Sequence, residues 1–202
     1  MPAVIAIDDA KKNEFDIRFS KRVPFLNSDV TNPALPSAFL SQGEPNRVIE
    51  PHYHDADEFL LIVGGGGVLG RHKVEPVTAF FARANTAYGP IVGAADTGIS
   101  FFVLFRNFDP GAKYLPAKRD ELKAIPNRRP LAVARKMPFR PLGTVRRGEV
   151  TWETHRDLCD SEGLFVKSLS AGPGQRTTAP APGSRRLRGR EAAGRAQLEH
   201  QD

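Results

Sequence analysis

The sequence predicts an all-β sandwich or barrel with a polar, disordered tail. Three observations lead to this fold class. Between residues 46 and 107, short apolar runs alternate with Gly, Pro, Asn or Asp, which is typical of strands joined by turns. No segment there sustains the 3.6-residue apolar period of a helix. The 18 glycines and 17 prolines of the chain also favour short strands over long helices.

Residues 1–40 are predicted to form an N-terminal arm with one or two short strands. Phe15–Phe19 alternates apolar and polar residues, as a half-buried strand does. Prolines at positions 24, 33, 36 and 45 exclude a long helix. An unpaired edge strand is a liability, so such an arm could pair with the sheet of a second copy, and we expect a homodimer.

The barrel itself is predicted over residues 41–115. Its strands are expected at 47–54, 58–63, 67–74, 78–82 and 99–106. The four glycines at 64–67 are interpreted as a hairpin turn, because no Lys-Ser/Thr follows them as in a phosphate-binding loop. Among the aromatic residues, Phe81 or Phe101 could reach a ligand in the barrel.

The remainder of the chain is predicted to hold less regular structure. Residues 116–171 are expected to begin with a short surface helix near 118–124. An Arg- and Pro-rich linker or strap follows at 126–143, and further strands at 145–169. Residues 172–202 are too poor in large apolar groups to offset the entropy of ordering, so a disordered tail is predicted.

Composition excludes several classes of function. The net charge is +6, but residues 171–202 hold six arginines against three acidic residues, so specific nucleic-acid binding is not expected. The single cysteine, Cys159, cannot form an internal disulfide and has no visible base for a nucleophilic role. No apolar run approaches the ~18 residues of a membrane span, and the N-terminus does not read as a signal peptide. A soluble, cytoplasmic protein is expected.

The segment 51–58 contains the candidate metal ligands His52, His54 and Glu58. Residues two apart on a strand point to the same face, so both imidazoles would point together. Glu58 would point to the same face if the strand, or a bulged continuation of it, extends from His54 to Glu58. Two imidazoles and one carboxylate form a mononuclear site that leaves coordination positions open.

His52, His54 and Glu58 are preceded by Pro51 and followed by an apolar run at 59–63 and, after six intervening residues, by Gly65. This pattern resembles the first signature of the cupin superfamily. The resemblance implies a double-stranded β-helix, or jelly roll, with a metal inside the barrel. Two imidazoles and a carboxylate suit Fe(II), which we favour, or Mn, Ni or Zn.

The second cupin signature is degenerate. The signature aligns with Val77–Val92 without a gap, but all of its defining residues are replaced. The residues at these positions are Val77, Arg83, Asn85, Tyr88 and Val92. Asn85 for glycine is mild because Asn tolerates positive φ, whereas Tyr88 replaces the histidine that would be the fourth ligand. Three outcomes stay open. The metal binds with three residues alone; Tyr88 ligates it or hydrogen-bonds to a metal-bound oxygen species; or the site is metal-free.

The leading functional prediction is a metal-dependent enzyme of small-molecule metabolism, by resemblance a dioxygenase acting on an aromatic or other small organic acid. Tyr88 would then be a catalytic proton donor. One alternative is a non-catalytic or sensory cupin that binds a small ligand, and another is a metal-dependent isomerase or decarboxylase. Residues 165–177 resemble the approach to another first signature whose histidines never follow, which suggests an incomplete second cupin.

Overall fold

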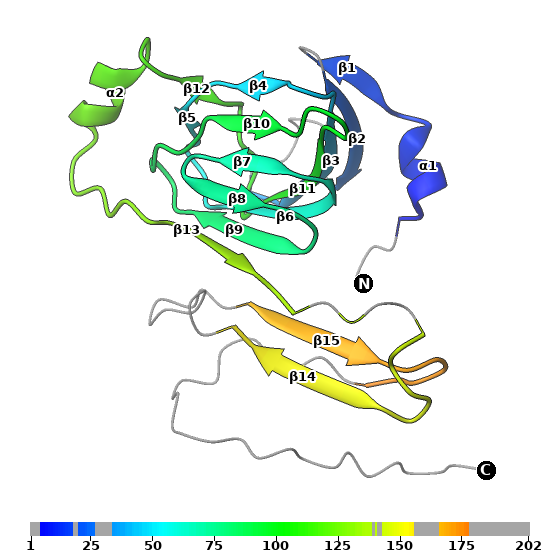
Figure 1. Cartoon of the computed structure of the whole chain (residues 1–202). Coiled ribbons are helices and arrows are strands. Elements are labelled where there is room, and N and C mark those ends of the chain that lie inside the picture. Colours follow the sequence, from blue (N-terminus) through cyan, green and yellow to red (C-terminus); the bar gives the residue numbers. More distant parts are fainter. Residues whose placement is uncertain are drawn as a thin grey trace.

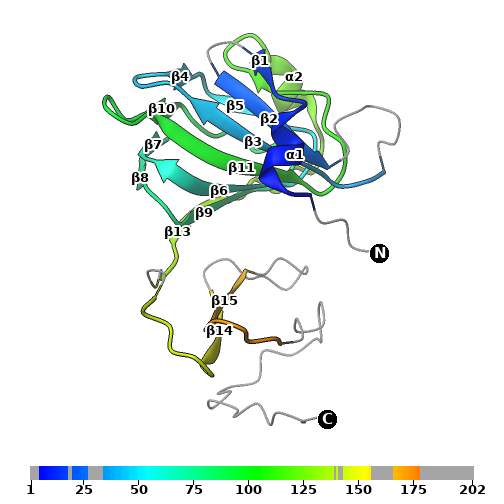
Figure 2. The same cartoon turned by 90° about the vertical axis from the view of Figure 1, so that its right-hand side faces the viewer.

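The computed structural model describes residues 5–17, 20–26, 34–138, 140, 143–155 and 166–177. Two antiparallel sheets, one of seven strands and one of four, face each other in a jelly-roll arrangement (Figures 1 and 2). The predicted all-β fold class is therefore confirmed. The described strands form two facing sheets and not one continuously hydrogen-bonded barrel.

The larger sheet contains strands from both the predicted arm and the predicted barrel. Its order is β1 (Phe15–Ile17), β2 (Ser20–Leu26), β3 (Ser37–Gly43), β11 (Ile99–Phe105), β6 (Glu58–Gly65), β9 (Thr78–Ala82) and β13 (Ala132–Lys136). The central strand β11 pairs with β3 on one side and β6 on the other. Chain segments far apart in sequence thus lie side by side.

The smaller sheet covers the larger one. Its order is β4 (Val48–Ile49), β10 (Ile91–Gly93), β7 (Gly67–Leu69) and β8 (His72–Val74). A separate pair joins β5 (His52–Tyr53) to β12 (Lys113–Tyr114). The predicted hairpin turn at the four glycines is wrong. Gly64 and Gly65 end β6, and Gly66 leads to β7, which lies in the other sheet and pairs with β8 and β10.

The main core lies between the two sheets. On β6, Leu60 and Ile62 point inward, and Leu69 and Ile91 meet them from the smaller sheet. The intervening residues of β6 point to the opposite face, so the alternation of a half-buried strand is observed. Burial of these aliphatic side chains stabilises the fold by about 1.5–3 kcal/mol for each large one.

The outer face of the larger sheet has its own cover. The short helix α1 (Ile7–Lys11) places Ala10 against Val23 and Leu40. Further along the same face, Phe81 packs with side chains from β13 and with Val166. These two clusters cover parts of this face, while Val63 and Leu104 on the same face stay exposed.

The N-terminal region is more regular than predicted. β2 and β3 are seven-residue strands inside the larger sheet, where one or two short strands were expected. Pro24 lies within β2, where the β2–β3 register shifts, and a proline is tolerated at a bulge. The predicted boundary after residue 40 falls inside β3.

The C-terminal part confirms the short helix and adds a strand. α2 (Arg119–Ala124) lies where a helix was expected. Within the predicted strap, β13 pairs along the full length of β9. Then β14 (Val150–Thr154) and β15 (Lys167–Ala171) form a hairpin apart from the two sheets (Figure 2).

Parts of the C-terminal predictions lie outside the described residues, namely Cys159 and residues 178–202 of the predicted tail. Within the described residues, no helix combines the length and apolar character needed to cross a membrane.

Candidate metal and ligand site

His52, His54 and Glu58 all line one cavity of about 90 Å³ inside the jelly roll. A strand carrying all three does not run through, because β5 ends at Tyr53 and Glu58 begins β6. All three side chains are nevertheless buried, and Glu58 shares the inward face of β6 with Leu60. The structure brings the three predicted ligands together along a bent backbone path.

Both histidine rings are held by their Nδ1 atoms. His52 Nδ1 lies 2.7 Å from the carbonyl oxygen of Glu50, and His54 Nδ1 lies 2.7 Å from Asp109 Oδ1. A carbonyl and a carboxylate only accept, so each Nδ1 carries the hydrogen. The Nε2 of each neutral ring then keeps a free lone pair, which is the arrangement found in metal-binding histidines.

Asp109 is a site residue that the sequence reasoning missed. Besides His54, its carboxylate accepts hydrogen bonds from the backbone N–H groups of Asp55 and Gly111, at 3.0 and 2.7 Å. These bonds outweigh its burial and lower the pKa of Asp109. No spacing connects position 109 with position 54, so only the folded chain brings them together.

Tyr88 lies between two of the candidate ligands. Its hydroxyl oxygen is 3.0 Å from His52 Nε2, and it donates a short hydrogen bond to Glu58 Oε2. Burial, together with the Glu58 carboxylate, raises the pKa of Tyr88 well above its ordinary value. The phenol therefore stays protonated, which favours a proton donor over a phenolate ligand.

Asn85, which was expected to stand in for a signature glycine, lies three residues before Tyr88. Its φ is 59°, the left-handed conformation that Asn tolerates better than most residues. The substitution thus preserves the backbone that leads to Tyr88.

Burial shapes the charges of the cavity. It lowers the pKa of His52 to about 4, so this ring is neutral near pH 7. It raises the pKa of Glu58, an effect that His54 and the Tyr88 hydroxyl oppose. For His54, the hydrogen bond to Asp109 and the charge of Glu58 outweigh burial and raise the pKa. The surroundings therefore favour positive charge at His54 Nε2.

The cavity offers few hydrogen-bond donors to its basic groups. His52, His54 and Glu58 all line it, and the one hydroxyl hydrogen of Tyr88 is donated to Glu58 Oε2. His54 Nε2 is 3.8 Å from Glu58 Oε1. Donors about 2.1 Å from one ion lie about 3.0–4.2 Å apart, so this spacing is compatible with a shared ion. The donor chemistry fits a divalent cation.

His52, His54 and Glu58 are not arranged as a complete set of metal ligands around one point. Within the described part of the chain, no three His, Cys, Asp or Glu side chains gather closely enough to hold a metal ion. The Tyr88 hydroxyl bridges His52 and Glu58 instead.

Other residues considered from the sequence fall on different sides of the sheets. Phe101 lines the cavity, whereas Phe81 belongs to the outer face. His72 is half-buried on β8 and is not part of the cavity lining. Arg22 and Arg47, which the sequence reasoning did not single out, both line the cavity.

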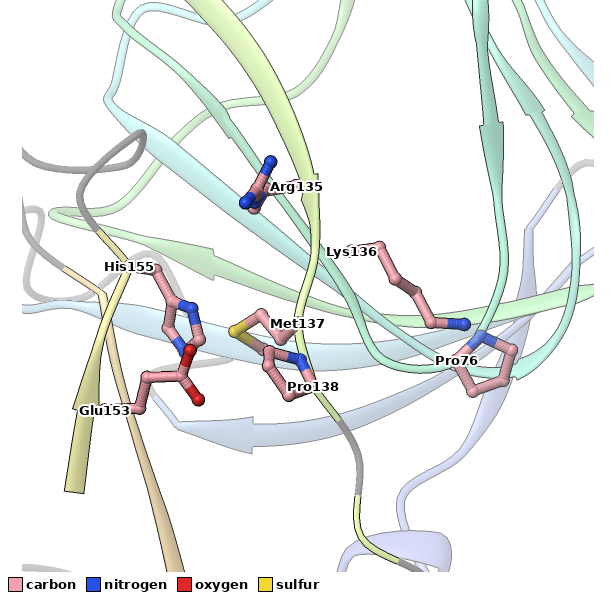
Figure 3. A pocket seen from close by; sticks show the side chains of 7 residues that line it. All are labelled: Pro76, Arg135, Lys136, Met137, Pro138, Glu153 and His155. Carbon is pink, nitrogen blue, oxygen red and sulfur yellow. The ribbon is translucent and has the colours of Figure 1, made fainter. Parts of the chain in front are cut away.

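A second hollow of about 510 Å³ lies between β13 and the end of β14 (Figure 3). Glu153 and His155 approach Met137 and Pro138 there, while Lys136 points toward Pro76. His155 Nε2 is 2.9 Å from the Ser168 hydroxyl. We place the candidate site in the smaller cavity, because the buried titratable groups converge there.

Comparison with known proteins gives structural likeness only. No protein-family model matches the chain, and no curated protein matches it. Among solved structures, the polyketide cyclase RemF from Streptomyces resistomycificus is 14% identical, with a TM-score of 0.46, over 60% of this chain and 94% of that one. KdgF from Halomonas sp. is 20% identical, with a TM-score of 0.38, over 49% of this chain and 88% of its own.

A variant of oxalate decarboxylase from Bacillus subtilis is also similar. It is 11% identical, with a TM-score of 0.44, and the match covers 67% of this chain but only 42% of that one. Likenesses this distant leave membership of the cupin superfamily a prediction. The jelly roll follows from the strand order described above.

Proposed function

We propose that this protein is a metal-dependent enzyme that acts on a small organic acid, with His52, His54 and Glu58 as the metal ligands. One observation carries the proposal: two imidazoles, both held through their Nδ1 atoms, share a buried cavity with a carboxylate. Such a set of basic groups is costly in a buried cavity unless a cation, a metal ion or a proton, compensates for it.

The residues of the chain have distinct roles in this proposal. The Glu50 carbonyl and the Asp109 carboxylate orient the two imidazoles. Tyr88 holds a proton at its hydroxyl, within reach of a ligand in the cavity. A bound divalent ion would supply a Lewis acid with coordination positions left open.

The class of reaction that we propose depends on the coordination positions that three protein ligands would leave open on the metal. A ligand set of two histidines and one carboxylate suits Fe(II) and oxygen chemistry, so the oxygenase remains our leading proposal. An isomerase or decarboxylase would use the same ligands without consuming oxygen. Oxygen uptake in the presence of candidate organic acids separates these classes.

A second candidate is a non-catalytic, small-molecule-binding protein. It is favoured by the hydrogen bond from Tyr88 to Glu58, which engages one candidate ligand while no three-ligand cluster is closed among the described residues. In that case the jelly roll would hold a ligand without a metal.

Metal analysis of protein purified without a histidine tag distinguishes the two candidates. We expect close to one Fe, Mn, Ni or Zn per chain in the wild type, because the donors converge in one cavity. The variants His52→Ala and Glu58→Gln should lose it. His72→Ala is the matched control, since His72 lies outside the cavity lining, and it should keep its metal. A wild type without metal, or His52→Ala with the same content, would reject the enzyme and favour the binder.

A further inference from the structure

Two arginines line the same cavity as the candidate metal ligands. Arg22 comes from β2, and Arg47 from the turn before β4. Arginine is always charged near neutral pH and presents several N–H donors in one plane. Their presence in a small cavity therefore needs a chemical explanation.

Arg22 is held by stacking and not by an ion pair. Its guanidinium lies over the ring of Phe39, 4.4 Å from the ring centroid. Its Nε atom is buried and has no hydrogen-bond partner among the described residues. Stacking of this kind fixes the plane of the guanidinium while leaving its edge available to a ligand.

The side chain of Arg47 occupies space that a side chain at position 43 would otherwise fill. A Cβ atom at Gly43 would lie 3.2 Å from Arg47 Cδ and 3.4 Å from Nη1, so the glycine makes room for this arginine. Arg47 Nη1 is also buried, and no described residue accepts a hydrogen bond from it.

The nearby carboxylates are already engaged. Asp109 accepts hydrogen bonds from His54 and two backbone N–H groups, and Glu58 accepts one from Tyr88. Among the described residues, no carboxylate lies within ion-pair distance of Arg22 or Arg47. Burial lowers the pKa of both arginines, as expected for charges removed from water without a close counter-ion.

We propose that Arg22 and Arg47 form a subsite for the carboxylate group of a small organic acid. This inference rests on the proposed function for the kind of molecule that enters the cavity, but binding of the anion does not require the metal. A carboxylate offers two oxygens that match the N–H groups of a guanidinium. The cavity volume of about 90 Å³ restricts the ligand to a small molecule.

The experiment measures binding of malonate to the full-length protein by calorimetry, both as purified and after treatment with a chelator. Malonamide is the neutral probe of nearly the same shape. Malonate should bind both preparations saturably, and malonamide at least tenfold more weakly. Loss of hydrogen bonds to a charged group predicts at least tenfold weaker malonate binding in Arg22→Gln and in Arg47→Gln.

Two further variants test the mechanism. Arg71→Gln removes a guanidinium on the exposed turn between β7 and β8 and should bind malonate like the wild type. Gly43→Ala keeps both charges but displaces Arg47, so it should also weaken binding.

The outcomes separate this inference from the proposed function. Equal binding of malonate and malonamide, or an equal loss in Arg71→Gln, would overturn the carboxylate subsite. Unchanged malonate binding in both Arg22→Gln and Arg47→Gln would overturn it as well. Absence of metal from the wild type would reject the enzyme, while malonate binding to that protein would still support the subsite.

Discussion

Tyr88 and Tyr53 are both buried, but only the hydroxyl group of Tyr88 has hydrogen-bond partners among the described residues. The Tyr88 hydroxyl connects His52 and Glu58, whereas the Tyr53 hydroxyl is buried with no hydrogen-bond partner among the described residues. A buried carboxylate that loses its donor is destabilised, while removal of an unsatisfied hydroxyl can be neutral or favourable. The pair therefore offers a matched comparison.

We expect Tyr88→Phe to lower the free energy of unfolding of the metal-free protein by about 1–3 kcal/mol, because Glu58 loses its hydrogen-bond donor. Tyr53→Phe should leave it unchanged or raise it slightly. Urea denaturation near pH 7 of chelator-treated samples measures both changes. Equal losses in the two variants would show that the hydroxyl of Tyr88 does not stabilise Glu58.

At the residue scale, the sequence predicted the part of the site that is local in the chain. His52, His54, Glu58 and Tyr88 line the cavity as predicted, and Asn85 has the positive φ expected of it. Asp109 and Arg22 were missed because only the folded chain brings them to the cavity. Arg47 is close to His52 in sequence, but it lies in a turn, where an arginine gives no sign of facing a cavity. A lone arginine on a strand carries no spacing signal that distinguishes a cavity residue from a surface one.

At the element scale, several glycines allow strands to approach closely at one end of the jelly roll. Gly98 has a φ of 62°, and a Cβ there would lie 2.2 Å from the carbonyl oxygen of Gly43. Gly148 also has a positive φ, 87°, but a Cβ there would meet nothing within 4 Å. Substitutions at these two glycines therefore distinguish the cost of backbone strain, present at both, from the cost of a steric clash, present only at Gly98.

Gly148→Ala should cost about 1–2 kcal/mol, which is the strain of an L-residue in the left-handed region. Gly98→Ala should cost about 1–3 kcal/mol more, because the added methyl group meets backbone that cannot move aside easily. Chemical denaturation of the two variants measures this difference. Equal costs would mean that the approach of Gly98 to Gly43 is not a constraint on the fold.

Most strand positions between residues 46 and 107 were predictable from alternating apolar residues and turn residues. The longer expected strands are broken, since residues 47–54 contain β4 and β5 and residues 67–74 contain β7 and β8. The strands β2, β3, β10 and β13 were not predicted individually. Pro24 in β2 and the three-residue length of β10 weaken the strand pattern of those two, and pairing with neighbours in the folded chain stabilises all four.

At the scale of the whole molecule, β13 is more closely tied to the jelly roll than the segment after it. β13 pairs with all of β9, whose five residues are buried. From the β14–β15 hairpin region, Val166 joins the cluster on the outer face. The edge of the larger sheet is thus completed by β13.

A chain ending after Pro138 should fold, with a melting temperature within a few degrees of the full chain, because it keeps β13. A chain ending after Pro130 should be strongly destabilised or fail to fold, since β9 becomes an uncovered edge. Calorimetric melting of the two shortened chains tests this. Similar melting temperatures for both would show that β13 is dispensable.

The predicted homodimer stays a prediction, although β1 is the edge strand through which the N-terminal region could pair with another copy. Phe15, on this strand, is 49% exposed. Sedimentation of wild type and Phe15→Asp would address this point.

Arg22 reaches the cavity from β2, a strand that precedes every candidate metal ligand in the chain. In the proposed subsite, Arg22 therefore comes from a part of the chain distant from the candidate metal ligands, whereas Arg47 is close to His52 in sequence. Exchanging the first 26 residues for those of a homologue could redirect substrate preference while leaving the histidine pair untouched.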